Sequence, residues 1–317
     1  MVRKFLAGID SSGAAGALIW SMYFHREGGG FRWHQIFTHP SLASYHWPGF
    51  APGEAHKERE LLAALREAGF KIQGLAVPPV PPPEAPMLLP VGDVPMLSWR
   101  GSVGASGYDI QRAAKADGPW QAAAENVSDG DVAYQPLWSD TAVRAGQTVY
   151  YRVIARNAAG ASPPSNVAGP VQVKGVCFVD ELRDLALASA KSDGLTLVND
   201  HNGCYAECLY RAKGDKGEWL VYQMPADITS FKISVWFTDK VSDLTLQVSR
   251  DGKEFADVKP DRSAQTFSNL PRDIIKVGGR TRVEYRGTVS AGNRCFRVLW
   301  TGPAELDRVE LCHPGAP

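Results

Sequence analysis

The chain has 317 residues, and its 34 Lys and Arg residues balance 34 Asp and Glu residues, so the formal net charge is zero. This length suggests two or three domains of about 100–150 residues each, and the neutral charge gives no support for a nucleic-acid or acidic-membrane partner. No apolar run approaches the roughly 20 residues that span a bilayer. Residues 1–8 begin with basic residues but lack the sustained apolar stretch of a signal peptide.

The first informative stretch is a short apolar run, residues 17–20, which is bounded by glycines and ends in Trp20. A run that is apolar on both faces predicts a buried strand of a parallel sheet. It leads into a polar loop built around three glycines, residues 28–30. Such a sequence is typical of the active face of a (β/α)8 barrel. We expect the Trp20 indole to form a flat floor for the apolar face of a sugar ring.

Residues 54–68 follow with helical periodicity, because Leu61, Leu62, Leu65 and Ala68 form one apolar stripe, and Gly69 is expected to cap the helix. Residues 76–86 are rich in proline, with five prolines in the six positions 78–83. Such a segment predicts an extended polyproline spacer and therefore a domain boundary.

Residues 16–34, together with the Tyr-His-Trp-Pro-Gly-Phe sequence of residues 45–50, resemble the last strand and last loop of glycoside hydrolase family 5, closest to its β-mannanase-like group. The resemblance covers residues 1–75. It implies a retaining (β/α)8 glycosidase with a nucleophilic glutamate at the end of strand seven and an acid/base glutamate at the end of strand four. Residues 3–10 then match the end of the helix before strand eight, and residues 54–68 match the eighth helix.

Trp20 matches the tryptophan that lines the sugar subsite in this family, whereas the two catalytic glutamates have no counterpart in the chain. Glu27 is the one carboxylate on the predicted active-face loop, and a single carboxylate cannot act as both nucleophile and acid. The resemblance therefore predicts no catalytic residue here. The predicted substrate-binding residues are Trp20, Tyr23, His25, Glu27, Trp33 and His34.

The leading hypothesis is that the chain is the C-terminal portion of a multidomain polysaccharide-degrading enzyme that is inactive alone. Its expected partners are a mannan-type polysaccharide and a missing N-terminal barrel segment, and no cofactor is predicted. The parent enzyme is expected to be bacterial and extracellular or in the cell envelope. The alternative is a non-catalytic carbohydrate-binding or structural module in which the barrel-like stretch is incidental, so whether the chain is an enzyme stays open.

Residues 87–173 contain short alternating segments, such as residues 96–99, 107–112 and 149–155, separated by turns. This pattern predicts a β-sandwich. Residues 150–166 resemble strands F and G of a fibronectin type III domain, in which Trp99 takes the place of the core tryptophan on strand B. Such a domain is either a spacer or a ligand-binding module, because the fold does not decide the function.

Residues 174–317 alternate again in segments that include residues 218–225, 230–237 and 294–300, with a hairpin turn expected at Asp251–Gly252. They resemble a galactose-binding-like jelly roll, a domain that either binds sugar or packs against a catalytic domain. Trp236 and Trp300 are expected in the core. An exposed platform is expected from Tyr205, Tyr210 or Tyr285. The predicted fold class is thus mostly β, with a barrel remnant (its last strand and helix), a fibronectin type III sandwich and a jelly-roll sandwich.

The chain has five cysteines. Cys204 and Cys208 have three residues between them, and with only His201 nearby the spacing favours a local disulfide or two buried thiols over a metal site, so no metal is predicted. Cys177 and Cys312 lie near the two ends of the predicted jelly roll. They are expected either to form a disulfide or to remain two buried thiols.

Overall fold

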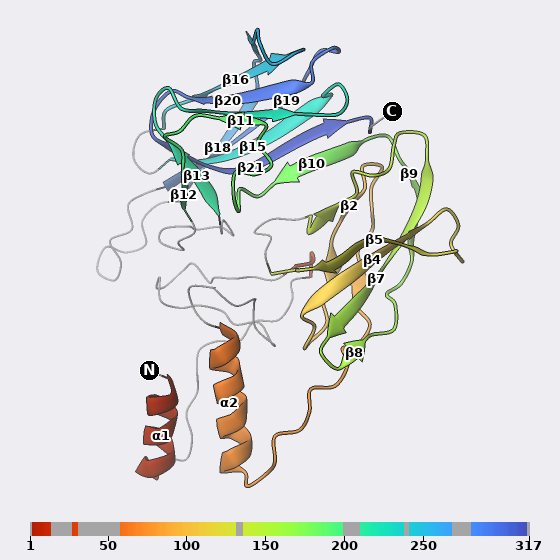
Figure 1. Ribbon diagram of the computed structural model, residues 1–317, viewed down its shortest axis with the longest axis vertical. Helices are drawn as coiled ribbons and strands as arrows, with labels where there is room; N and C mark the ends of the chain where they lie inside the picture. The colour runs from red at the N-terminus through yellow and green to blue at the C-terminus, as the bar shows by residue number, and fades with distance from the viewer. Residues whose placement is uncertain are drawn as a thin grey trace.

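The computed structural model describes residues 2–13, 27–30, 58–130, 136–198, 210–237, 241–267 and 280–315 (Figure 1). The described chain has two helices near its N-terminus, followed by two β-sandwiches that contain all of its described strands. The prediction of a mostly β protein is confirmed. The strand predicted at residues 17–20 lies outside the described residues.

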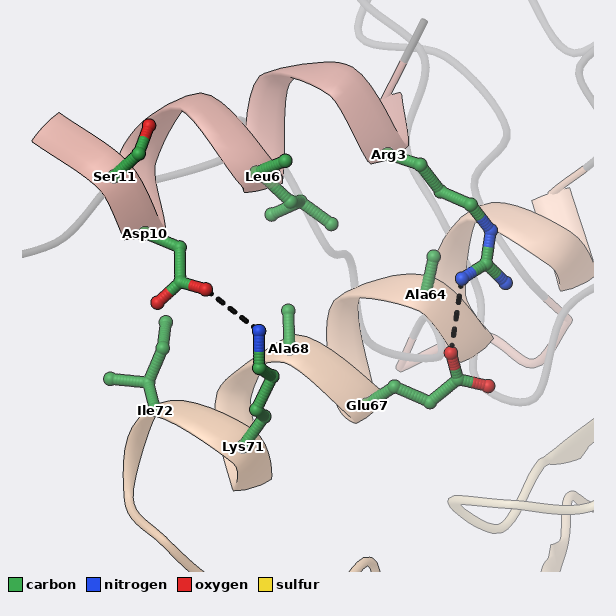
Figure 2. A pocket seen from close by; sticks show the side chains of 10 residues that line it. Arg3, Leu6, Asp10, Ser11, Ala64, Glu67, Ala68, Lys71 and Ile72 are labelled. Atoms are coloured by element: carbon green, nitrogen blue, oxygen red, sulfur yellow. Dashed lines mark hydrogen bonds and ion pairs between the residues drawn. The ribbon is translucent and has the colours of Figure 1, made fainter.

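The two helices, α1 (Val2–Ser12) and α2 (Glu58–Ile72), lie side by side and run in the same direction (Figure 2). Arg3 near the start of α1 forms an ion pair with Glu67 at 3.2 Å, and Asp10 near its end pairs with Lys71 at 2.7 Å. Both pairs are exposed and therefore contribute little to stability.

The predicted end of the second helix was wrong, because α2 continues through Gly69 to Ile72. The cap lies at Gly74, whose φ of +66° is a conformation that glycine adopts without strain. The Gly74 amide donates to the Lys71 carbonyl at 3.0 Å, and the Leu75 amide donates to the Phe70 carbonyl at 2.9 Å. These two bonds form a Schellman motif, which satisfies the last carbonyls of the helix.

The proline-rich segment that follows α2 contacts the first sandwich. The Arg66 guanidinium of α2 donates to the Pro78 carbonyl at 2.6 Å, and the side-chain amide of Asn157 donates to the Pro81 carbonyl at 2.8 Å. The Ser102 hydroxyl donates to the Glu84 carbonyl at 2.6 Å. The carbonyl groups of the segment, which proline retains although it lacks an amide hydrogen, thus accept from α2 at Pro78 and from the sandwich at Pro81 and Glu84.

The first sandwich has two layers. One layer pairs β1 with β3 and β2 with β6, and the other has the order β5-β4-β7-β8, with β9 also pairing with β7. Trp99 is fully buried between them, 5.2 Å from the Tyr108 ring, as expected for a core tryptophan. The strands are β1 (Met87–Leu88), β2 (Met96–Leu97), β3 (Trp99–Arg100), β4 (Gly107–Ala113), β5 (Gln121–Val127), β6 (Trp138–Ser139), β7 (Thr148–Asn157), β8 (Gly160–Ala161) and β9 (Ala168–Gln172).

The second sandwich is a jelly roll of two antiparallel sheets. The seven-stranded sheet has the order β12-β13-β21-β15-β19-β18, with β10 pairing with β21, and the five-stranded sheet has the order β11-β14-β20-β16-β17. The strands are β10 (Val176–Asp180), β11 (Ala190–Lys191), β12 (Thr196–Val198), β13 (Arg211–Gly214), β14 (Trp219–Gln223), β15 (Ser230–Phe237), β16 (Leu244–Ser249), β17 (Ala256–Asp257), β18 (Asp261–Phe267), β19 (Arg280–Thr288), β20 (Cys295–Trp300) and β21 (Ala304–His313).

The predicted placements of two tryptophans differ in outcome. Trp300 is 1% exposed and belongs to the core between the two sheets, as expected. Trp236 is also buried, but it lies on the outer face of the seven-stranded sheet, because its neighbours Val235 and Phe237 fill the core. The expected hairpin at Asp251–Gly252 exists, since β16 pairs with β17, and its connection spans residues 250–255.

The two sandwiches meet at the junction of β9, β10 and the C-terminus. Cys177 of β10 lies directly opposite Cys312 of β21, and a disulfide joins them. Next to it, the Ser139 hydroxyl of the first sandwich donates to the Cys177 carbonyl. The Ala145 amide donates to the Pro314 carbonyl at 2.9 Å. The end of the chain therefore returns to contact the first sandwich.

Candidate functional site

Most of the predicted site residues lie outside the described residues: Trp20, Tyr23, His25, Trp33, His34, Cys204 and Cys208. Glu27 is described and is exposed at the start of the segment 27–30. In the described part of the chain no group of three or more His, Cys, Asp or Glu side chains could hold a metal ion. Among the described helices, none is long and apolar enough to cross a membrane.

The outer face of the five-stranded sheet carries an apolar row. Along β14 the side chains of Leu220 and Tyr222 enter the core, so the alternation of the strand turns Trp219 outward. Trp219 lies opposite Leu299 of β20, which lies opposite Thr245 of β16. All three side chains are half-buried and open to solvent on one side. The row therefore presents the Trp219 indole and the Leu299 side chain next to each other on the outer face of the sheet.

A polar row runs beside the apolar one. Arg297, Gln247 and Asp257 face one another across β20, β16 and β17. The Arg297 Nε donates to the Gln247 Oε1 at 2.7 Å, and the Gln247 Nε2 donates to the Asp257 Oδ1 at 2.7 Å. The Arg297 guanidinium also lies over the Phe255 ring, 3.9 Å from its centroid. The three polar groups are thus aligned, and each is fixed by its neighbour.

The backbone at Trp219 is fixed by the chain beside it. The Trp219 amide donates to the Ser192 hydroxyl at 2.9 Å, and the Ser192 amide donates to the Trp219 carbonyl at 3.0 Å. The carboxylate of Glu218 accepts from the Ser192 hydroxyl and from the Gly194 amide at 3.1 Å. Such bonds hold the backbone at the start of β14 in place, so the strand presents Trp219 at a fixed position on the sheet.

The two rows together suit a polyhydroxylated ring. Neighbouring strands are about 4.8 Å apart, and successive outward residues on one strand are about 7 Å apart. A sugar ring lying on Trp219 and Leu299 would therefore direct hydroxyl groups toward Arg297 and Gln247. The Arg297 guanidinium donates hydrogen bonds, whereas the Gln247 side-chain oxygen and the Asp257 carboxylate accept them. A sugar hydroxyl could therefore both accept and donate a hydrogen bond here.

The outer face of the seven-stranded sheet carries similar residue types but is closed. Arg211 is fully buried and pairs with Glu305 at 2.7 Å. Arg308 is 1% exposed and pairs with Glu310 at 2.7 Å and with Glu181. The Trp236 indole donates to the Asp307 carboxylate at 3.0 Å. These groups are bonded to one another inside the protein, as buried charges must be.

An open pocket of about 390 Å³ lies between the two helices, and its apolar lining consists of Leu6, Ala7, Ala64, Ala68 and Ile72 (Figure 2). Its charged side chains, Arg3, Asp10, Glu67 and Lys71, are paired with one another across the two helices. The Ser11 hydroxyl donates to the Gly8 carbonyl at 3.1 Å. The pocket offers an apolar lining without the aligned donors and acceptors of the five-stranded sheet, so we place the candidate site on the sheet.

The sequence contained a usable signal for this site. The segment that starts at Trp219 alternates as a strand, and its core residues Leu220 and Tyr222 imply that Trp219 faces outward. Tyr285 was wrongly expected on an exposed platform, because it is 1% exposed and lies in the core on β19. Tyr210 is half-buried, with the Arg183 guanidinium over its ring, and Tyr205 lies outside the described residues.

No protein-family model matches this sequence, and no curated protein matches it. Among solved structures, a family 6 carbohydrate-binding module from Clostridium stercorarium in complex with cellobiose is similar at 11% identity, covering 44% of this chain and 94% of that chain with a TM-score of 0.26. A β-1,3-glucan-binding family 6 module from Bacillus halodurans is similar at 12% identity, covering 43% and 93% with a TM-score of 0.26.

An exo-β-1,3-galactanase from Phanerochaete chrysosporium is similar at 12% identity and covers more of this chain, 73%, together with 56% of that chain, with a TM-score of 0.24. Identities and TM-scores this low leave the function to be argued from the residues of the chain itself.

Proposed function

We propose that the second sandwich binds polysaccharide on the outer face of its five-stranded sheet, and that the chain is the C-terminal portion of a multidomain polysaccharide-degrading glycosidase of the β-mannanase-like group. The observation that carries the binding proposal is the half-buried Trp219–Leu299 row beside the bonded series Arg297, Gln247 and Asp257. Aromatic side chains supply contact area on such sites, and the aligned polar groups supply orientation.

The parallel arrangement of α1 and α2 supports the barrel part of the proposal. In a (β/α)8 barrel, successive helices run in the same direction because a strand returns the chain between them. The ion pairs Arg3–Glu67 and Asp10–Lys71 fix that direction here. The 45 residues from 13 to 57 are long enough for a strand with its flanking loops.

The first sandwich is proposed to be a fibronectin type III-like domain. Its layers, with β5-β4-β7-β9 facing the pairs β1–β3 and β2–β6, and its buried Trp99 support this assignment. The Cys177–Cys312 disulfide supports an extracellular or cell-envelope location for the parent enzyme, because disulfides persist in oxidising compartments.

Catalysis is not proposed for this chain alone. Retaining hydrolysis needs two carboxyl groups about 5–5.5 Å apart, one as nucleophile and one as acid/base. Glu27 is the single carboxylate of the predicted active-face loop. The 317-residue chain should therefore release no reducing sugar from mannan, and activity should appear only when an N-terminal barrel segment supplies the two glutamates. Release of reducing sugar that is lost in Glu27→Gln would contradict this proposal.

The binding proposal is tested by electrophoresis of the full chain through gels that contain mannan, glucomannan, cellulose derivatives or β-1,3-glucan. Retardation by at least one polysaccharide is expected for the wild type and for Trp120→Ala, and it should disappear in Trp219→Ala. Trp120 is the matched control, because it is also half-buried but has the Arg152 guanidinium over its ring, where a sugar would have to lie. Equal retardation of both variants would refute the site.

A structural role for the second sandwich is favoured by one observation, the burial of Arg211 and Arg308 on the seven-stranded sheet. Side chains on the outer face of a sheet are buried in this way where other parts of the protein cover that face, and their charges are then paired. We therefore propose that this sandwich both packs within the chain through one sheet and binds polysaccharide through the other.

A further inference from the structure

The segment 27–30 contacts the first sandwich beside the short strand β6. Among the described residues, β6 is two residues long and pairs with Met96 and Leu97 of β2. The Gly30 amide donates to the Trp99 carbonyl at 3.0 Å. Gly29 and Gly30 are buried, whereas Glu27 and Gly28 are exposed. Gly30, from the N-terminal part of the chain, thus donates to a backbone carbonyl of the sandwich core.

This contact favours glycine at both positions, and more strictly at Gly29 than at Gly30. Gly29 has a φ of +92° and Gly30 a φ of +71°, which residues with a Cβ rarely adopt. A Cβ on Gly29 would lie 3.0 Å from both the amide nitrogen and the carbonyl oxygen of Trp99, and this backbone cannot move aside. A Cβ on Gly30 would lie 2.9 Å from a methyl group of Leu137, which is the flexible end of a side chain.

We propose that the first sandwich is the receptor for the glycine loop, residues 27–30, and holds this loop in place through the edge of β3. The sandwich is then more than a spacer, because it fixes the position of Glu27 relative to both sandwiches. The importance of Glu27 for substrate rests on the proposed function, whereas the contact itself does not. The close approach to the backbone of the sandwich explains Gly29, and the positive φ of Gly30 explains the second glycine.

The proposal predicts a local change in hydrogen exchange, measured by mass spectrometry on the full 317-residue chain. In the wild type the Gly30 amide should exchange slowly, because it is hydrogen-bonded and buried. In Gly29→Ala it should exchange at least about tenfold faster, since the close approach to Trp99 is lost. Gly30→Ala should have a smaller effect, because Leu137 can move.

Two controls separate loss of the contact from general destabilisation. Gly28→Ala changes an exposed neighbour and should leave the exchange of Gly30 within about twofold of the wild type. Gly146→Ala introduces the same kind of backbone strain in the first sandwich, at a φ of +89° with open space around the Cβ, and should also leave it unchanged.

Melting curves show whether each variant folds, and if Gly29→Ala does not fold, the milder Gly30→Ala carries the test. Fast exchange of Gly30 in the wild type, or equal effects of Gly29→Ala and Gly146→Ala, would overturn the proposal. Polysaccharide binding is measured separately, so its failure would not be mistaken for failure of this contact.

Discussion

The two outer faces of the second sandwich carry similar side chains, but these side chains are buried on one face and reach solvent on the other. On the seven-stranded sheet, Trp236, Arg211 and Arg308 are buried. Each is bonded to a carboxylate of strand β21, and Arg308 is also bonded to Glu181. On the five-stranded sheet, Trp219 and Arg297 are half-buried and reach solvent. A tryptophan or an arginine in a strand therefore does not identify a binding site by itself, because its burial decides whether its polar groups are available to a ligand.

The largest effect on stability is expected at the disulfide, which joins β10 to β21 of the seven-stranded sheet. Replacing both Cys177 and Cys312 by serine should lower the free energy of unfolding by about 4 kcal/mol, because the bond closes a loop with a sequence separation of 135 residues. Urea denaturation measures the change. Cys295→Ala, at a buried free thiol, is the control. Equal midpoints for the double variant and the wild type would show that the bond does not form in solution.

The next effect separates the two faces directly. Arg308→Met removes a buried cation from between Glu181 and Glu310 and should cost about 3 kcal/mol of stability, since Glu181 loses this partner and Glu310 keeps Lys232. Arg297→Met on the open face should change stability by less than about 0.5 kcal/mol. Similar losses in both variants, measured by denaturant titration, would mean that the faces do not differ in the way described.

For polysaccharide binding, the substitution on the five-stranded sheet should have the larger effect. Arg297→Met should weaken the affinity for the polysaccharide retained by the wild type by about tenfold, because a charged hydrogen bond to a hydroxyl is worth about 1.5 kcal/mol or more. Arg308→Met, in conditions where it remains folded, should bind as the wild type does. Isothermal titration provides the two affinities. A wild-type affinity in Arg297→Met would remove the polar row from the site.

The smallest effect concerns pH. Burial raises the pKa of the Asp180 carboxyl, although the Leu182 amide and the Tyr222 hydroxyl bond to it and oppose the shift. The folded state therefore keeps a proton that the unfolded chain loses near pH 4, so this group should lower stability as the pH rises from about 4 to the raised pKa. Asp180→Asn should remove that loss. Melting temperatures of the two proteins should diverge over this range. Parallel curves would contradict the predicted fall in stability with rising pH.

Sequence patterns predicted the strands of both sandwiches well where alternation was clear. Trp300 was placed in the core because it alternates with polar neighbours, and Trp99 because it takes the place of the core tryptophan of a fibronectin type III domain; both are buried. Strand β19 was not predicted, since Arg282, Glu284 and Arg286 make it look like a loop; in the structure Lys232 is paired with Glu284, and Val283 and Tyr285 fill the core. The burial of charge on the outer face depends on tertiary packing, which a local pattern does not contain.

The candidate site was predictable only in part. The outward position of Trp219 follows from strand alternation, but its neighbours Leu299 and Arg297 come from a strand about 80 residues later, and that pairing depends on sheet order. The predicted sugar-binding residues around Trp20 stay a prediction. The contact of Gly30 with Trp99 joins residues far apart in the sequence, so no local pattern could have indicated it.

The account depends most on the claim that the five-stranded sheet, and not the seven-stranded one, meets the polysaccharide. Oxidative footprinting of the tryptophans, with and without the polysaccharide retained by the wild type, tests it directly. Trp219 should be oxidised in the free protein and protected in the complex, while the buried Trp236 should remain unmodified in both. Protection that is absent at Trp219, or oxidation of Trp236 that the polysaccharide suppresses, would contradict the account.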